Sequence, residues 1–351
     1  MISEDVQSSI DMIRESARGI VSHGDLSRVR KLRFTDPGFD RAVWGEMCDM
    51  GWPALRLPED KGGVGLGLLP YCALAEEVGR GLMPEPLVPG ALAAALLDGD
   101  ALAAHLAGDT LVLPAWQDSR DAIGPEKPLG AEGDKVSATK LYVPVAGGAD
   151  AFLVIGTDGA ALVQADAEGV TIAAEKAQDG TTLARVTFEK AQGKVIAADP
   201  RPAFAEAALA TAAYLLGLMD SALDMTVAYL KERVQFGRPI GTFQVLQHMA
   251  VDLKLELEVS RASVEDAAQL WDRDGPTPET YAAISRAKAR TTQSALRLTR
   301  ETIQLHGGIG FTDEHDIGLY LRKAIVMAAQ YGSAECHRRA YAALKPIEEE
   351  A

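Results

Sequence analysis

The stretch from Ala328 to Glu335, AAQYGSAE, contains two side chains that could exchange protons. Tyr331 precedes a Gly-Ser step, and Glu335 follows it by four residues. A general base works best when its pKa lies near the working pH, which a carboxylate can reach by tuning, whereas an ordinary tyrosine has a pKa of about 10. A proton-removing enzyme would therefore need a base from Glu335 or from elsewhere in the chain.

Two further motifs combine a cation or glycines with an expected helix end. KERVQFGRPIG (231–241) places Arg233 at the end of a long helix, where the helix dipole alone favours a cation. QLHGGIGF (304–311) has adjacent glycines that let another molecule approach the backbone closely, although a helix cap is the commoner use of glycine there. His306 alone is more often a core or capping residue than a catalyst. Each motif by itself leaves both interpretations open.

Several kinds of site have no signature in the sequence. No Ser/His/Asp set, no cluster with metal-ligand spacing and no GxGxxG pattern is visible, so no metal site is predicted. The glycine-rich run DKGGVGLG has no Lys-Ser/Thr after it and is not a phosphate-binding loop.

Composition and charge restrict the class of protein. The 351 residues carry a formal net charge of −15, with 47% hydrophobic and 24% charged residues, which indicates a globular protein of two or three domains and argues against nucleic acid or an anionic membrane as partner. Cys48, Cys72 and Cys336 are far apart, which favours a reducing, cytoplasmic location over a disulfide framework. The start of the chain is unlike a signal peptide, and we expect no apolar run of the roughly 18 residues that a membrane span needs.

The succession of patterns predicts an α+β fold in three parts. Residues 1–108 read as an N-terminal α-helical domain. Residues 109–199 contain short β-branched runs such as KVSATKLYVPV and AFLVIG, which predict an antiparallel β-barrel or sandwich domain. Residues 200–351 return to long helical patterns, broken at GRPIG and DGPTPE, and predict a C-terminal four-helix bundle. We expect Thr242 to cap the second helix of this bundle and the third to run from Pro278 to near His306.

Taken in order, the motifs resemble those of the acyl-CoA dehydrogenase family. The matching segments are LPEDKGGVGLGLL, ALAEEVGRGLMPEP, RVQFGRPIGTFQVLQ and QLHGGIGFTDEHDIGLYLRKA, and the resemblance covers residues 1–345. It implies the same three-part fold, FAD as cofactor, an acyl-CoA substrate and α,β-dehydrogenation. In that reaction a carboxylate takes the α-proton, which the thioester makes acidic, while a hydride leaves the β-carbon for the flavin.

The catalytic base that the resemblance implies is absent from its usual positions. Members of the family usually have Glu-Gly-Thr where this chain has Tyr331, Gly332 and Ser333. Some members place the base on the first helix of the bundle instead, and the matching residue here is Ala207. Glu206 and Glu335 are the nearest carboxylates. One residue turns a side chain by about 100° on a helix, so Glu206 should point away from the position of Ala207. We therefore predict no catalytic residue in this chain, with a relocated base as the alternative.

The residues that would hold the chain's own flavin also differ from the family. The loop that resembles Thr-Glu-Pro-x-Ala-Gly-Ser-Asp in the family reads PAWQDSRDAIG here (114–124). The family's aromatic-Ile-Thr-Asn run reads Tyr142-Val143-Pro144-Val145, and Pro144 offers neither a backbone N–H nor a hydroxyl.

The residues that reach across to a neighbouring subunit's FAD in the family are retained. These predicted cofactor-binding residues are Arg233, Phe236, Gln244, Gln304, Gly307 and Gly308. The pattern resembles the non-catalytic subunit of heteromeric (α2β2) acyl-CoA dehydrogenases of steroid side-chain breakdown. It implies a dimer or tetramer with a related subunit that carries the base, an FAD shared with that subunit, and electron-transfer flavoprotein as acceptor. A self-sufficient enzyme with a relocated base and a flavin-free acyl-CoA-binding or scaffold protein remain alternatives.

Overall fold

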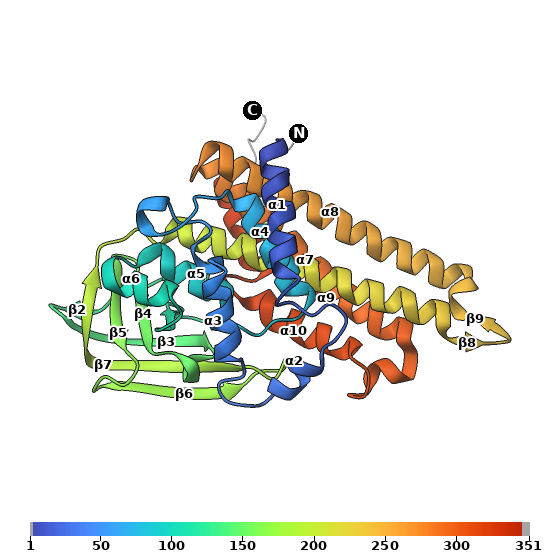
Figure 1. Ribbon diagram of the computed structural model, residues 1–351, viewed down its shortest axis with the longest axis horizontal. Helices are drawn as coiled ribbons and strands as arrows, with labels where there is room; N and C mark the ends of the chain where they lie inside the picture. Colours follow the sequence, from blue (N-terminus) through green and yellow to red (C-terminus); the bar gives the residue numbers. More distant parts are fainter. Residues whose placement is uncertain (1–2, 346–351) are drawn as a thin grey trace. The chain divides into compact units, whose positions relative to one another are not determined.

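The computed structural model describes residues 3–345 and divides the chain into two compact units (Figure 1). Of the described residues, one unit comprises 3–28, Cys72–Met83 and 209–345, and the other comprises Val29–Tyr71 and Pro84–Ala208. The predicted domain boundaries near residues 108 and 199 stay a prediction.

Long helices build the unit that contains most of the C-terminal half. Helices α8 and α9 run antiparallel, because Asp266 pairs with Arg286 while Glu256 pairs with Arg297. Helices α10 and α11 both pack along α9. Together they form the fourth helical segment of the predicted four-helix bundle. The helices are α1 (Glu4–Ala17), α7 (Arg201–Glu232), which enters this unit at Leu209, α8 (Gln244–Asp274), α9 (Pro278–His306), α10 (Ile317–Ala329) and α11 (Ala334–Leu344).

Local signals at the helix ends agree in part with the sequence predictions. Helix α9 begins at Pro278 behind a capping box formed by Thr277 and Thr280, and it ends at His306, so both predicted ends are confirmed. The prediction that Thr242 is the N-cap of α8 is wrong. Phe243 is the N-cap of α8, without a side-chain cap, and the Thr242 hydroxyl donates instead to the carbonyl oxygen of Pro239, 2.7 Å away. The intervening residues form a hairpin of β8 (Val234–Gln235) and β9 (Arg238–Pro239).

Helix α7 is apolar enough, by length and composition, to cross a membrane, contrary to the expectation from the sequence. Of the most apolar 18-residue stretch of α7, 89% is buried inside the structure. A helix covered by protein on all sides has no polar face, so burial explains the composition.

Two glycines let α7 and helix α4 (Leu68–Arg80) cross at backbone contact. A Cβ atom on Gly79 would lie 2.0 Å from the carbonyl oxygen of Tyr214, and one on Gly217 would lie 1.8 Å from that of Glu76. Both positions therefore require glycine for a packing reason.

The other unit is built around one seven-stranded sheet with strand order β1-β4-β5-β7-β3-β2, and β6 also pairs with β7. The predicted α+β class is confirmed. The prediction of purely antiparallel pairing is wrong at one place, because β1 pairs parallel with β4, and the strand order does not close into a barrel. The strands are β1 (Val112–Ala115), β2 (Ala131–Glu132), β3 (Lys135–Pro144), β4 (Ala151–Gly156), β5 (Gly159–Gln164), β6 (Val170–Lys176) and β7 (Thr182–Ile196).

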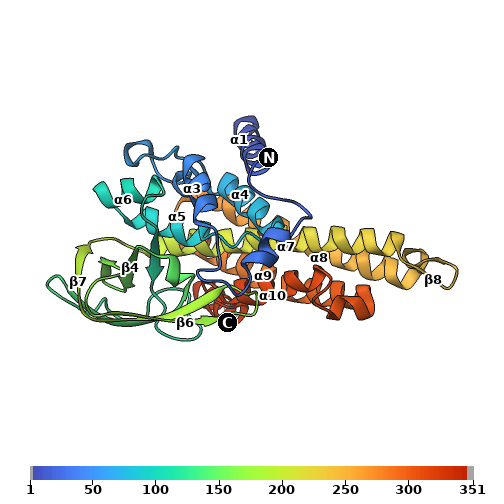
Figure 2. The ribbon, with the colours of Figure 1, turned by 60° about the horizontal axis from the view of Figure 1, so that its bottom comes forward.

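Short helices lie beside this sheet. Figures 1 and 2 show α3 (Arg41–Asp49), α5 (Leu87–Leu96) and α6 (Gly99–Leu106) together on one side of it, with α5 packed on β1. Gly90 of α5 meets the buried ring of Trp44 of α3, where a Cβ atom would lie 2.4 Å from the ring. Helix α2 (Ser27–Leu32) is divided between the two units, because one unit includes the chain up to Arg28 and the other begins at Val29.

Candidate functional site

Tyr331, at the family's usual base position, is a buried residue in the turn between α10 and α11. Its side chain is 3% exposed, and its backbone is left-handed with φ of 55°. Nε2 of His337 lies 2.8 Å from the Tyr331 carbonyl oxygen and holds this turn against α11. Burial raises the pKa of the Tyr331 hydroxyl above its usual value, which disfavours its ionised form near neutral pH.

A buried lysine that the sequence did not point to lies under the same turn. Nζ of Lys288 contacts Thr292 Oγ1 at 3.2 Å and the carbonyl oxygens of Met327 and Ala328 at 3.5 and 3.4 Å. These carbonyls end α10, where the helix dipole favours a cation. Complete burial lowers the pKa of Lys288 to about 7. No sequence signal distinguishes this lysine, because its burial comes from three helices packed together.

At the alternative base position, Ala207 is buried and its neighbour Glu206 is held in an ion pair. Arg56 donates from Nε to one Glu206 carboxylate oxygen at 3.1 Å and from Nη2 to the other at 2.5 Å. Arg56 also donates to the carbonyl oxygen of Leu66 at 2.6 Å, in the glycine-rich segment. Both carboxylate oxygens of Glu206 are therefore engaged by the Arg56 guanidinium, which fixes the side chain in this ion pair.

The other candidate for a relocated base, Glu335, lies in the first turn of α11 and is exposed. Tyr331 is buried, so the two side chains do not share one environment. The structure thus gives Glu335 the role of an acidic residue at a helix N-terminus, where the helix dipole favours it.

The segment that replaces the family's flavin loop contains a buried ion pair. Nζ of Lys140 lies 2.8 Å from Oδ1 of Asp118 and also donates to the carbonyl oxygens of Trp116 and Ile155. Burial by itself raises the pKa of Asp118, but the hydrogen bonds from Lys140 and from the backbone N–H of Glu126 and Lys127 lower it below its usual value. Desolvation lowers the pKa of Lys140. Residues 114–124 are therefore bound to the chain's own sheet by a charged side chain.

The run from Tyr142 to Val145 is irregular. Strand β3 shifts register against β7 between Lys140 and Val143, and both Tyr142 and Val145 have positive φ, of 56° and 47°. The bulge leaves Tyr142 44% exposed while Val143 is buried. Such backbone strain in a non-glycine residue is uncommon and concentrates at functional segments.

The retained residues of the arginine motif lie on the surface of the helical unit. Arg233 directly follows α7 and is exposed, and Phe236, at the tip of the β8–β9 hairpin, is 91% exposed. Phe236 and Gly237 both have positive φ, as a tight two-residue hairpin turn requires. Gln244 is exposed in the first turn of α8.

The retained residues of the glycine motif lie at the end of α9. Gln304 is exposed, Gly307 ends the helix with φ of 65° and ψ of −143°, and Gly308 belongs to the 3-10 helix η5 (Gly307–Phe311). Nothing lies within 4 Å of a Cβ atom built on either glycine. The backbone at Gly307 needs glycine for its own conformation, whereas Gly308 has no positive φ and no neighbour that excludes a side chain.

Stacked rings join these two motifs. The rings of Tyr229, in the last turns of α7, and His306, at the end of α9, stack with centroids 4.5 Å apart, and His315 packs on His306 at 4.6 Å. The structure therefore brings Arg233 and the glycine motif to the same end of the helical unit. His306 was predicted only as a single residue, and no local pattern in the sequence indicates this cluster, because residues 229, 306 and 315 meet only when the helices pack.

These retained residues fit part of an FAD molecule. Arg233 and the side-chain amides of Gln244 and Gln304 are exposed donors, and the open space at Gly308 leaves its backbone accessible. Such a donor set suits phosphate oxygens and the adenosine end of the cofactor. The two segments that resemble the family's isoalloxazine contacts differ from this donor set. In residues 114–124, Asp118 forms an ion pair with Lys140 of strand β3. In the run from Tyr142 to Val145, Pro144 has no backbone N–H to donate.

Among residues 3–345, no group of three or more His, Cys, Asp or Glu side chains is arranged to hold a metal ion. Cys48, Cys72 and Cys336 are buried free thiols, and burial raises the pKa of Cys48 to about 12.

Comparison with known protein families gives matches in both helical parts of the chain. Residues 7–98 match the acyl-CoA dehydrogenase N-terminal domain, and residues 200–344 match the acyl-CoA dehydrogenase C-terminal domain. The protein named acyl-CoA dehydrogenase IpdE2 from Mycolicibacterium smegmatis is 33% identical over 332 residues, which cover 93% of each chain. Its namesake from Mycobacterium tuberculosis is 33% identical over 350 residues, covering 97% of this chain and 96% of that one.

Solved structures show the same fold. A chain of a variant of the Tcur3481–Tcur3483 steroid ACAD superposes with a TM-score of 0.86 at 30% identity and covers 97% of this chain and 98% of its own. Butyryl-CoA dehydrogenase from Megasphaera elsdenii superposes with a TM-score of 0.81 at 20% identity, covering 98% of each chain. Together with the matched domains at both ends and the IpdE2 relatives, these similarities show that the chain belongs to the acyl-CoA dehydrogenase family.

Proposed function

We propose that this chain is the non-catalytic subunit of a heteromeric (α2β2) acyl-CoA dehydrogenase. The observation that carries the proposal is the state of the base positions, where Tyr331 is buried and protonated and Ala207 has no ionisable group. The two substitutes are unsuitable as well, because Glu206 is paired with Arg56 and Glu335 is exposed on α11. The base would come from a related subunit.

The second part of the proposal concerns the cofactor. Bound FAD supplies the electron acceptor for α,β-dehydrogenation of an acyl-CoA thioester. Arg233, Phe236, Gln244, Gln304, Gly307 and Gly308 would hold the adenosine and phosphate part of an FAD shared with the related subunit. The accessible backbone at Gly308 and the exposed Arg233 support this assignment.

The relatives suggest the substrate class. One similar structure is named Tcur3481–Tcur3483 steroid ACAD. Another, at 23% identity, is the ChsE4–ChsE5 complex from Mycobacterium tuberculosis. We therefore propose a steroid-derived acyl-CoA as substrate, electron-transfer flavoprotein as the acceptor of electrons from the complex, and a cytoplasmic location.

The test compares the chain alone with the chain co-expressed with each acyl-CoA dehydrogenase-type subunit of its own genome that has an intact Glu-Gly-Thr motif. We expect little flavin absorbance and no acyl-CoA oxidation from the chain alone, and both from one co-expressed pair. Stoichiometric flavin and turnover in the chain alone would instead support the self-sufficient enzyme. A colourless chain that joins no related subunit would support the scaffold alternative.

Variants of the retained motif test the flavin assignment in that pair. Arg233→Ala should weaken flavin affinity about ten- to a hundredfold, as expected for loss of a charge-assisted hydrogen bond. Gly308→Val should lower flavin occupancy by filling the open space beside its backbone. Lys231→Ala is the matched control, because Lys231 is an exposed cation in the last turn of α7. A lower melting temperature with unchanged flavin content would mean that the motif serves the fold alone.

A further inference from the structure

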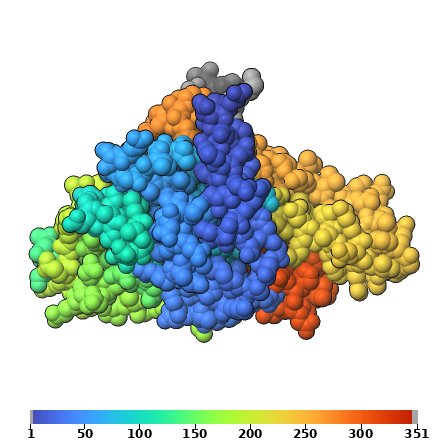
Figure 3. All heavy atoms as spheres, viewed as in Figure 1, coloured from blue at the N-terminus to red at the C-terminus, as the bar shows by residue number. Residues whose placement is uncertain are grey.

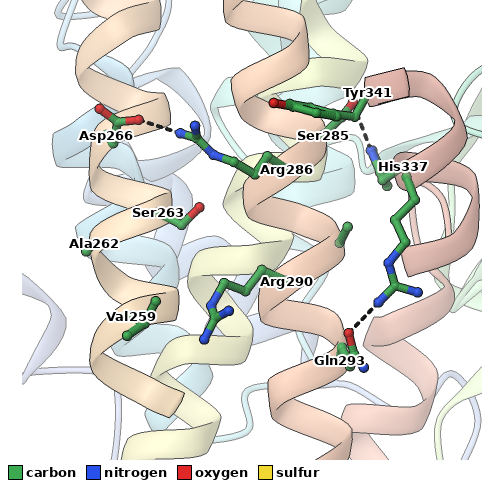
Figure 4. Close-up of a pocket in the computed structure, with 12 residues that line it drawn as sticks. Val259, Ala262, Ser263, Asp266, Ser285, Arg286, Arg290, Gln293, His337 and Tyr341 are labelled. Carbon is green, nitrogen blue, oxygen red and sulfur yellow. Dashed lines mark hydrogen bonds and ion pairs between the residues drawn. The ribbon is translucent and has the colours of Figure 1, made fainter. Parts of the chain in front are cut away.

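The buried histidines in the described part of the chain differ in how their ring nitrogens are paired. Three are buried, namely His105, His306 and His337, and His105 has partners at both nitrogens. So has His337, whose Nδ1 lies 3.3 Å from Ser285 Oγ, as Figure 4 shows, and whose Nε2 lies 2.8 Å from the carbonyl oxygen of Tyr331. Of these described histidines, only His306 has a ring nitrogen, Nε2, that is buried without a hydrogen-bond partner.

The hydrogen bond at the other nitrogen fixes the tautomer of His306. Nδ1 lies 2.7 Å from the carbonyl oxygen of Thr302, one turn earlier in α9. A carbonyl oxygen can only accept, so Nδ1 carries the proton. A second proton would create a buried N–H at Nε2, where no acceptor lies within the residues described. The site therefore fits the neutral imidazole and disfavours the imidazolium.

The surroundings of the ring also favour the neutral state. Burial lowers the pKa of His306 below its ordinary value of 6.5, the hydrogen bond to Thr302 opposes this effect, and His315 lowers the pKa further. The helix dipole at the end of α9 favours a cation, so burial is the larger effect. Nδ1 of His315 accepts from the backbone N–H of Ile317 at 3.1 Å, which requires that nitrogen to be deprotonated. Both imidazoles of the stack are thus bound as neutral rings.

The charged residues on the surrounding elements do not change this balance. They are Glu301 on α9, Glu232 and Arg233 at the end of α7, and Asp313, Glu314 and Asp316 around His315. None of them is among the groups that alter the pKa of His306. Within the described residues, the ring therefore has no carboxylate that would stabilise it as a cation.

The ring of His306 connects the two parts of the retained motif. It stacks on Tyr229 with centroids 4.5 Å apart and an interplanar angle of 24°. The carbonyl oxygen of Tyr229 accepts from the backbone N–H of Arg233 at 2.9 Å. On the other side, His306 directly precedes Gly307, and a Cβ atom on Gly310 would lie 3.0 Å from His306 Cβ. In Figure 3 the end of α7, in yellow, and the segment after α9, in orange-red, both reach the surface.

We propose that His306 is a positioning residue of the shared flavin site, whose neutral ring holds Arg233 and the glycine motif together and whose protonation releases the flavin. The inference rests on the proposed function for the existence of a shared FAD. A protonated ring could find an acceptor for Nε2–H by turning out toward water, which would break its stacking with Tyr229 and His315. The ends of α7 and α9 would then no longer be held in one arrangement.

The first test measures the flavin affinity of the co-expressed pair from about pH 8 to about pH 5, through the fluorescence of released FAD. Uptake of one proton on release predicts that the dissociation constant rises by up to about tenfold per pH unit below pH 6.5. His306→Ala should weaken binding at pH 8 about two- to tenfold, as expected for loss of an aromatic stack. His306→Phe should recover most of this loss and abolish the acid dependence, because its ring stacks and cannot be protonated.

Two further variants identify the group that titrates. His23→Gln removes an exposed imidazole that pairs with Glu77 and should leave the acid dependence in place. His315→Gln removes the neighbouring ring and should also leave an acid dependence, because His306 remains. Melting temperatures of the isolated variants establish that they fold.

The second test uses the unmodified chain without flavin or partner. Nitrogen-15 labelling of its six histidines reports the tautomer and titration of each ring, and His306→Phe identifies the signal of His306. We expect a neutral His306 at pH 7 with its proton on Nδ1, titrating below pH 6.5. An imidazolium at pH 7, or a proton on Nε2 of the neutral ring, would overturn the inference.

The outcomes separate this inference from the proposed function. If the pair binds flavin but His306→Phe keeps the acid dependence, or His315→Gln abolishes it, the inference is wrong while the proposed function stands. If both His306 variants lower the melting temperature and leave flavin affinity unchanged at every pH, the stack serves the fold alone. If no related subunit restores flavin binding, the proposed function fails and the inference fails with it.

Discussion

Lys140 Nζ and Asp118 Oδ1 lie 2.8 Å apart, and both side chains are almost completely buried. The pair joins strand β3 to the segment that replaces the family's flavin loop. Breaking a buried ion pair by removing one partner leaves an uncompensated charge and typically costs about 3–5 kcal/mol.

Replacing the cation of this pair tests how firmly the segment is held. Lys140→Met should lower the free energy of unfolding in urea by about 3–5 kcal/mol, because Asp118 remains buried and charged. The double variant Lys140→Met/Asp118→Asn should recover part of the loss, since the amide can still accept from the backbone N–H of Glu126. Equal losses in the single and double variants would contradict a strong pair.

The same pair predicts part of the acid sensitivity. The pKa of Asp118 is lower in the folded protein than its ordinary value of 3.8, so the unfolded state binds its proton first as the pH falls. Its contribution is therefore present above the ordinary pKa and is lost as the pH falls through the folded one. Asp118→Asn should be less stable at pH 7 and should show a shallower loss of stability in acid. Parallel curves for the two proteins from pH 6 to 2 would count against this.

The buried lysine under the Tyr331 turn also makes stability rise with pH, but in a higher pH window, and here the substitution is expected to stabilise the protein. The pKa of Lys288 falls from 10.5 to about 7 on folding, so the unfolded chain binds more protons between these values and stability rises with pH there. Lys288→Met should remove this rise and stabilise the protein at pH 6 by roughly 1–4 kcal/mol, as seen when buried charges are replaced by apolar groups. Lys231→Met, at an exposed site, should change neither quantity. A destabilised Lys288→Met would show that the contacts with the end of α10 outweigh desolvation.

The crossing of α4 and α7 predicts a packing effect that opposes helix propensity. Gly217→Ala should lower the free energy of unfolding by about 1–3 kcal/mol or more, because the new Cβ atom would lie 1.8 Å from the carbonyl oxygen of Glu76. Gly45→Ala in α3 is the matched control. Nothing lies within 4 Å of its Cβ atom, so the propensity gain of about 0.5–1 kcal/mol should appear as stabilisation. The same sign for both substitutions would contradict the close crossing.

The proposed absence of a base in this chain predicts the activity of two carboxylate variants in the co-expressed complex. Glu206→Gln and Glu335→Gln should each leave kcat within about twofold, whereas loss of a general base typically lowers it by 10² or more. Glu206→Gln should still lower the melting temperature, since it weakens the ion pair with Arg56. A large loss of kcat in either variant, with the protein folded, would identify a relocated base.

Features that depend on neighbours along the chain could be predicted from the residues alone. The start of α9 at Pro278 and its end at His306 follow from a capping box and a glycine stop, which act within one helical turn. The order of helical and β-branched segments likewise predicted the α+β class, and the motifs around Arg233 and Gly307 indicated the family. Thr242 shows the limit of local signals, because its hydroxyl bonds back to Pro239 and α8 begins one residue later than predicted.

The burial and pairing of the residues that could do chemistry depend on contacts between elements that are distant in the sequence. Glu206 and Arg56 are 150 residues apart, and no local pattern predicts that one holds the other. The same is true of Asp118 with Lys140, and of Lys288, which has an ordinary sequence context and is buried by the end of another helix. Burial and the distances between charges are set by elements that meet in space, and these quantities fix the protonation and accessibility on which function depends.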